Sequence, residues 1–194
     1  MDLEQPPEKN GSKHHRREAP EKIQVEVCKD PAGFSGDWSK LYQALAVPHG
    51  IQGICAFSRH AFERQLAISG IVVHLAWCGG RLVGAQLFFQ QDDVVHCHLG
   101  AVVDEGYETG AFYAMDRFAI DYFSGRARKL DLGGGTGFPS DGDDGLSLYK
   151  KGWASETRPV CFCGRIASHD QYEALAPPSG GTGYFPAYRE GEFG

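Results

Sequence analysis

No stretch of this 194-residue chain is apolar enough to be a membrane span. The most apolar region, residues 68–89, is interrupted by Ser69, His74 and Arg81, whereas a spanning helix needs about 20 mostly apolar residues. The first 22 residues also lack the apolar stretch of an export signal. We therefore expect no membrane span and a cytoplasmic location.

The sequence has no excess of basic residues. It holds 19 Lys and Arg against 25 Asp and Glu, which gives a formal net charge of −6. Proteins that bind extended nucleic acids usually carry a basic balance or a basic stripe. The dense basic clusters here are short, at residues 13–17 and 126–129. The charge thus argues against an extended nucleic-acid interface and leaves a small contact with an RNA end open.

The cysteines do not fall at the spacing of a metal site. Cys161 and Cys163 have no second pair at zinc-site spacing. Asp141, Asp143 and Asp144 are spaced as in a calcium loop, but the glutamate at the twelfth position of that loop is absent. We therefore predict no metal site and expect reduced cysteines that pack as small apolar side chains.

The composition indicates one folded domain with a polar tail. Residues 1–21 are polar, with balanced charges and three prolines, so they cannot bury enough surface to order themselves and are predicted to be a disordered tail. Residues 22–194 are predicted to be a single domain. Within it, residues 177–183 form a loose stretch, and the aromatic segment 184–188 is expected to dock back on the domain.

Apolar periodicity predicts a mixed α/β fold of the α+β type. The predicted strands are residues 23–28, 71–78, 82–90, 94–103, 130–132 and 160–166. The predicted helices are residues 38–45 capped by Asp37, a helix capped by Ser58, and residues 109–123, 146–151 and 169–175. Three meandering strands followed by a crossover helix and another strand indicate a mixed, mainly antiparallel sheet flanked by helices.

The junction of residues 104–111, between a strand and a helix, is a candidate phosphate site. Backbone N–H groups at a helix start attract phosphate, and glycines allow close approach. The candidate donor-binding residues here are Gly106, Tyr107, Thr109, Gly110 and Ala111. The alternative is a capped helix after a turn, because the acidic residues of this junction oppose an anion.

Three successive glycines, Gly133, Gly134 and Gly135, follow directly after a predicted strand. Such a run is costly unless the backbone must take unusual angles or touch a ligand. We therefore include all three among the donor-binding candidates. The dinucleotide-binding order of glycines and the long helix that follows it are missing, so that fold is rejected.

His96, Cys97 and His98 lie together on a predicted strand. Alternation places the two histidines on one face and the cysteine on the other. Either histidine could act as a general base, while a packed, hydrogen-bonded histidine is the alternative. The sequence spaces no third metal ligand nearby.

The run from residue 130 to residue 153 resembles the Fem-type (FemABX-like) branch of the GNAT acyltransferase superfamily. The motifs are Leu-Gly-Gly-Gly at 132–135, Asp-Gly-Leu at 144–146, Tyr149-Lys150 and Gly152-Trp153. Further similar positions are Leu41-Tyr42, the strand 84–89, residues 96–101 and Tyr172. The resemblance covers about residues 23–190 and implies a GNAT-like fold. Fem-type enzymes contain two such domains and a helical arm, whereas this chain holds one.

The resemblance implies transfer of an acyl group to an amine without a covalent enzyme intermediate. Acyl-CoA or an acyl carrier is the favoured cosubstrate, with no tightly bound cofactor, and the acidic charge makes aminoacyl-tRNA the less favoured donor. The expected partners are a small-molecule or peptide amine and, as donor, an acyl carrier protein or a tRNA.

Site residues follow from the same resemblance. Tyr149 and Lys150 match the family's aromatic–lysine pair, in which Lys150 would hold a donor phosphate or stabilise an oxyanion. The junction of residues 104–111 matches the family's cradle for the pyrophosphate of coenzyme A. A solvated lysine is the alternative for Lys150. For the whole chain, the alternative is a non-catalytic binding domain or one half of a two-domain Fem-type aminoacyl transferase.

Overall fold

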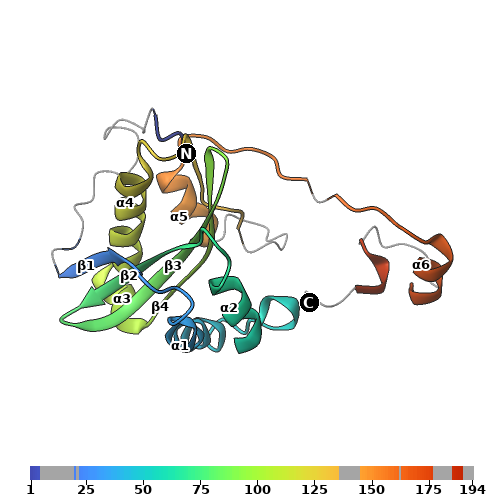
Figure 1. Ribbon diagram of the computed structural model, residues 1–194, viewed down its shortest axis with the longest axis horizontal. Coiled ribbons are helices and arrows are strands. Elements are labelled where there is room, and N and C mark those ends of the chain that lie inside the picture. The colour runs from blue at the N-terminus through green and yellow to red at the C-terminus, as the bar shows by residue number, and fades with distance from the viewer. Residues whose placement is uncertain (5–19, 21, 136–144, 162, 177–184, 190–194) are drawn as a thin grey trace.

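A five-stranded sheet lies at the centre of the computed structural model (Figure 1), which describes residues 1–4, 20, 22–135, 145–161, 163–176 and 185–189. The strands, in their spatial order, are β1 (Ile23–Val27), β2 (Val72–Cys78), β3 (Arg81–Gln91), β4 (Val94–Val102) and β5 (Lys129–Asp131). The first four pair antiparallel, and β4 pairs with β5 in parallel. The mixed, mainly antiparallel sheet predicted from the sequence is therefore confirmed.

The hairpin between β2 and β3 turns on two glycines. Gly79 and Gly80 have φ of 55° and 78°, in the left-handed region that the two central residues of a tight hairpin turn require. Their Cβ positions would meet nothing, so the glycines serve the backbone angle and not packing. The consecutive order of β2, β3 and β4 follows from such short connections.

Helices cover both faces of the sheet (Figure 1). Helices α1 (Ser35–Ala46) and α2 (Arg59–Leu66), linked by the short 3-10 helix η1 (Gly53–Cys55), cover one face. Helices α4 (Ala111–Phe123) and α5 (Gly145–Trp153) lie on the other. The core of the first face includes Trp38, Phe62, Leu66 and Leu87, and that of the second Phe88, Phe123, Leu130 and Trp153.

Two helix starts differ from the sequence prediction. The helix predicted over residues 109–123 is divided by Gly110, whose φ of 75° breaks the right-handed path, and residues 104–109 form a separate helix, α3 (Asp104–Thr109). Helix α1 begins at Ser35 after Phe34 and not after Asp37. Asp37 lies instead in the first turn and forms an ion pair with Lys40 at 2.9 Å.

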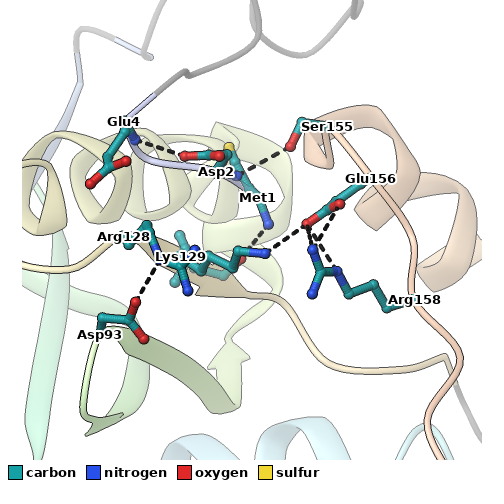
Figure 2. A network of polar contacts seen from close by, with 10 residues as sticks. Met1, Asp2, Glu4, Asp93, Arg128, Lys129, Ser155, Glu156 and Arg158 are labelled. Carbon is teal, nitrogen blue, oxygen red and sulfur yellow. Dashed lines mark hydrogen bonds and ion pairs between the residues drawn. The ribbon is translucent and has the colours of Figure 1, made fainter.

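The outer edge of β5 is paired with residues 1–4 (Figure 2). The Leu3 nitrogen donates to the Arg128 carbonyl oxygen at 2.8 Å, and the Leu130 nitrogen donates to the Met1 carbonyl oxygen at 2.9 Å. Met1 and Leu3 are buried, although they fall in the stretch expected to be a disordered tail. Ion pairs around this edge join Arg128 to Asp93 and Lys129 to Glu156.

The strand predicted over residues 160–166 is wrong. The described residues of this range have no strand structure, and Val160 is 91% exposed. Its apolar pattern had suggested a last strand of the sheet. The β5 edge that a further strand could join is occupied by residues 1–4.

The C-terminal aromatic segment packs on α6 (His169–Leu175), which Figure 1 shows away from the sheet. The Phe185 ring stacks on Tyr172 at 6.1 Å, and the short 3-10 helix η2 (Ala187–Arg189) places Tyr188 at 5.7 Å from the same ring. The described residues of the segment expected to dock on the domain therefore contact α6. None of the helices in the described part of the chain is long and apolar enough to span a membrane.

His74 on β2 is fully buried beneath α4 inside a cage of aromatic rings. The rings of Phe88, Phe118, Tyr122 and Phe123 lie 4.7–5.6 Å from the imidazole. Among the described residues, neither ring nitrogen has a hydrogen-bond partner. Burial lowers the pKa of His74 to about 4, so the folded protein keeps this side chain neutral.

Replacing His74 with leucine should make stability less sensitive to acid. Between pH 6.5 and pH 4 the unfolded chain binds a proton that folded His74 refuses, so the wild type loses stability as the pH falls. The stability of His74→Leu relative to wild type should therefore increase by about 2 kcal/mol from pH 7.5 to pH 5.0, as measured by urea unfolding. A difference that stays constant would contradict this explanation.

Gly106 in α3 packs directly on the sheet. An added Cβ would lie 2.5 Å from the Val83 carbonyl oxygen and 2.9 Å from the Val102 Cβ. Gly106→Ala should therefore destabilise the fold by about 1–3 kcal/mol, because the backbone of α3 must shift. The control is Gly36→Ala in α1, where an added Cβ meets nothing. This substitution should stabilise the fold by about 0.5–1 kcal/mol. Equal denaturation midpoints for the two variants would refute this packing role.

Candidate functional site

The parallel pairing of β4 with β5 covers three residue pairs and ends at His96 and Asp131. From Cys97 to Val102, β4 pairs with β3 but has no β5 partner among the described residues. The chain after Asp131 enters the glycine run instead. This divergence leaves backbone hydrogen-bonding groups of β4 without a neighbouring strand, which is a common setting for a ligand.

His96 and the glycine run meet at Asp131. The His96 Nδ1 lies 3.1 Å from Asp131 Oδ2, and the Gly133 backbone N–H donates to Asp131 Oδ1 at 2.8 Å. Gly133 has a φ of 73°, so a left-handed residue is required at this position. The structure therefore brings together two of the candidate residues and adds Asp131, which the sequence analysis did not select.

Lys150 lies on the other side of the same run. Its ammonium donates to the Gly134 carbonyl oxygen at 2.5 Å, and its Nζ lies 3.6 Å from the position a Cβ on Gly133 would take. Gly134 and Gly135 are exposed. Lys150, Gly133 and Gly134 are thus neighbours in space as well as in the motif. The residue expected to start this helix, Asp144, lies outside the described residues.

Tyr149, the residue before Lys150, points into the protein. Its hydroxyl donates to Asp116 Oδ2 at 2.5 Å, and Gln86 Nε2 donates to Asp116 Oδ1 at 2.7 Å. Burial raises the pKa of Asp116 to about 6 and also raises the pKa of Tyr149. The network joins α4, α5 and β3, so it fixes the helix that presents Lys150.

The sequence analysis missed Asp116 and Gln86. A signal existed for Asp116, because it follows Phe112 by four residues and precedes Ala119 by three, on the buried side of α4. An acid on that side of a helix indicates a buried polar partner. Gln86 lies in an apolar strand. One polar residue in such a strand does not indicate which partner it contacts.

The junction of residues 104–111 folds as α3, Gly110 and the first residue of α4. Close packing on Val83 explains why a glycine stands at position 106, and no ligand contact is needed to account for it. The Thr109 hydroxyl donates to the Glu105 carbonyl oxygen at 2.6 Å. Tyr107 is half-exposed, and its ring lies 5.9 Å from Phe112.

Phe112 connects this junction to the lysine helix. Its ring lies 6.5 Å from that of Tyr149, so the N-terminus of α4, with Gly110 and Ala111, is close to α5. Glu105 is paired with Arg81 at 2.5 Å, which partly offsets the acidic charge of α3.

His98 and Cys97 have surroundings that differ from those of His96. The register of β3 and β4 shifts between Leu87 and Phe88, which leaves His98 as the extra residue of a β-bulge. Its ring lies 5.3 Å from Phe89 and 6.3 Å from Phe57, and burial lowers its pKa.

Cys97 is not arranged as a nucleophile. Burial raises the pKa of its thiol to about 12, so the thiol stays protonated at neutral pH and the reactive thiolate is not formed. No group of three or more His, Cys, Asp or Glu side chains that could hold a metal occurs within the described residues.

One family profile and several solved structures match this chain. The profile of the acetyltransferase (GNAT) domain matches residues 10–150. A ribosomal-protein-alanine N-acetyltransferase from Brucella melitensis biovar Abortus 2308 shares the fold with a TM-score of 0.53 and 16% identity, over 74% of this chain and 99% of that one. No curated protein sequence matches the chain.

Two further solved structures show the same fold. A possible acetyltransferase from Clostridium difficile 630 gives a TM-score of 0.58 at 9% identity, over 76% of this chain and all of that one. The aminoglycoside N-acetyltransferase AAC(6')-Iy in complex with CoA gives 0.52 at 12% identity, over 74% of this chain and 94% of that one. Because the matched domain spans well over half of the sequence, the chain belongs to the GNAT acetyltransferase family and is an acyltransferase.

Proposed function

We propose that this protein transfers an acyl group from acyl-CoA to the amine of a small molecule or peptide. The observation that carries the proposal is the gathering of His96, the glycine run and Lys150 where β4 and β5 part. A general base and a cation catalyse amine acylation, and an exposed glycine backbone allows a donor to approach closely.

Coenzyme A suits this site better than tRNA does. The net charge of −6 opposes a long polyanion, whereas one pantetheine arm requires only local donors. Lys150 and the backbone N–H groups at the start of α4, near Gly110 and Ala111, could serve as those donors. One structural neighbour was solved with CoA. An acyl carrier protein would present the same arm and is the second donor that we consider.

The proposed reaction is a direct transfer. The amine nitrogen attacks the thioester carbonyl carbon, and His96 takes the proton that this nitrogen gives up. Lys150 or a backbone N–H of the glycine run stabilises the oxyanion of the tetrahedral intermediate. The carbon–sulfur bond then breaks, and CoA leaves as the thiolate. The protonated thiol of Cys97 supports a route without an acyl-enzyme.

The Fem-type branch is also part of the proposal. Lys150 of the aromatic–lysine pair contacts Gly134 of the glycine run, although the two residues are 16 positions apart in the sequence. This contact supports their treatment as one motif. In our proposal Tyr149 holds α5 in place through Asp116, and Lys150 faces the donor.

A second candidate function is a non-catalytic binding domain, or one half of a two-domain Fem-type aminoacyl transferase. The acidic helix α3 favours it, because Asp104, Glu105 and Glu108 lie where the family would bind the pyrophosphate. Anions are disfavoured beside such residues. Measurements of donor binding and of turnover together separate the two functions.

Acetyl-CoA should stabilise the protein against heat. A ligand at about 100 times its dissociation constant adds roughly 2.7 kcal/mol, which raises the melting temperature by about 5–10 °C for a chain of this size. Differential scanning fluorimetry with acetyl-CoA, CoA and charged tRNA measures the shift. No shift with any of them contradicts the proposal. A shift without acetylation of a panel of amino acids, amino sugars and peptides supports the binding domain.

Lys150→Ala should lower the rate of acetyl transfer by about 100- to 1000-fold, the usual effect of losing one oxyanion donor. The melting temperature should change little, because the side chain is not part of the apolar core. The matched control is Lys151→Ala on the same helix, which should keep near wild-type turnover. Wild-type turnover in both variants, or a loss confined to Lys151→Ala, would show that the lysine assignment is wrong.

A further inference from the structure

One carboxylate contacts both halves of the proposed site. Asp131 uses Oδ2 toward His96 Nδ1 at 3.1 Å and Oδ1 toward the Gly133 N–H at 2.8 Å. His96 and Asp131 are also the last residue pair of the β4–β5 ladder. Both backbones are therefore held in register where the two side chains meet, which limits how far the imidazole can move.

The chemistry of this contact selects one form of His96. An ionised carboxylate accepts hydrogen bonds and has no proton to donate. The Nδ1 atom must therefore carry the proton, and in the neutral ring the free electron pair is then on Nε2. The His96 side chain is 44% exposed, so it remains accessible from outside the core.

We propose that Asp131 is a positioning residue that fixes His96 as the Nδ1–H tautomer and thereby makes Nε2 the atom that takes the proton from the acceptor amine. This inference rests on the proposed function and adds the residue that prepares the base. His98 has no carboxylate partner among the described residues, and its neighbours are the rings of Phe57 and Phe89. Of the two histidines, the surroundings favour His96.

Asp131 also connects the base to the glycine run. Its bond to Gly133 holds the start of the run, while Lys150 holds the Gly134 carbonyl oxygen. One side chain therefore contacts both His96 and the start of the glycine run.

Asp131→Asn tests the inference with nearly unchanged shape. The asparagine oxygen can still accept from the Gly133 N–H, but its NH₂ group would face His96 Nδ1. The histidine must then accept at Nδ1 and carry its proton on Nε2, which is the wrong tautomer for a base at Nε2. Nitrogen-15 NMR of the full chain with labelled histidine reports the tautomer, and His96→Gln assigns the signal.

We expect the Nδ1–H form in the wild type and the Nε2–H form in Asp131→Asn. Turnover with acetyl-CoA should fall about 100- to 10,000-fold in kcat, with little change in the KM for acetyl-CoA. The control is Asp93→Asn, which removes the ion pair with Arg128 and should alter neither the tautomer nor kcat.

The NMR readout separates this inference from the proposed function. A wild-type His96 in the Nε2–H form, or a tautomer that does not change in Asp131→Asn, overturns the inference whatever the activity. Full turnover in Asp131→Asn combined with loss in His96→Gln also overturns it, while the acyltransferase site stands. A tautomer switch in a protein that acetylates no amine supports the positioning by Asp131 and refutes the proposed reaction.

Discussion

The parallel pairing of β4 with β5 is the constraint on which the site depends. A parallel neighbour requires a crossover connection, and α4 provides it by packing on the sheet between the two strands in sequence. Because β5 is only three residues long, the ladder stops at His96 while β4 continues. His96, the glycine run and the lysine helix all lie where that pairing ends.

Buried polarity ties the lysine helix to the rest of the domain. Asp116 sits in an apolar environment where an unpaired carboxyl group would be costly. It is satisfied by Gln86 from the sheet and Tyr149 from α5. Few positions of α5 allow Tyr149 to form this hydrogen bond with good geometry. The network therefore restricts the position of α5 more than apolar packing of Trp153 alone would. Lys150 follows Tyr149 on α5, so the same network also fixes where Lys150 lies.

The sheet meander could be predicted from the sequence because its information is local. Alternating apolar residues and the Gly79–Gly80 turn lie within short stretches of sequence. These stretches were enough to predict β2, β3 and β4. Helix α3 is not predicted by the local pattern, and the close packing of Gly106 on the Val83 carbonyl oxygen is a contact between residues far apart in sequence. Residues 160–166 have a strand pattern, but edge occupancy by residues 1–4 is a long-range fact that no local window contains.

The residues of the candidate site also differ in whether local sequence could identify them. The glycine run could be identified because three successive glycines follow a predicted strand, and Lys150 because its segment resembles the Fem-type branch. The two histidines could be identified because they share one face of a predicted strand next to that loop. Asp131 could not be distinguished from any strand-ending aspartate, since its importance comes from the partner that β-sheet register places opposite it. Sequence alone therefore names candidate residues, and pairing between distant strands determines which histidine lies beside a carboxylate. For an enzyme that must move one proton, the orientation of the base is as necessary as the base itself.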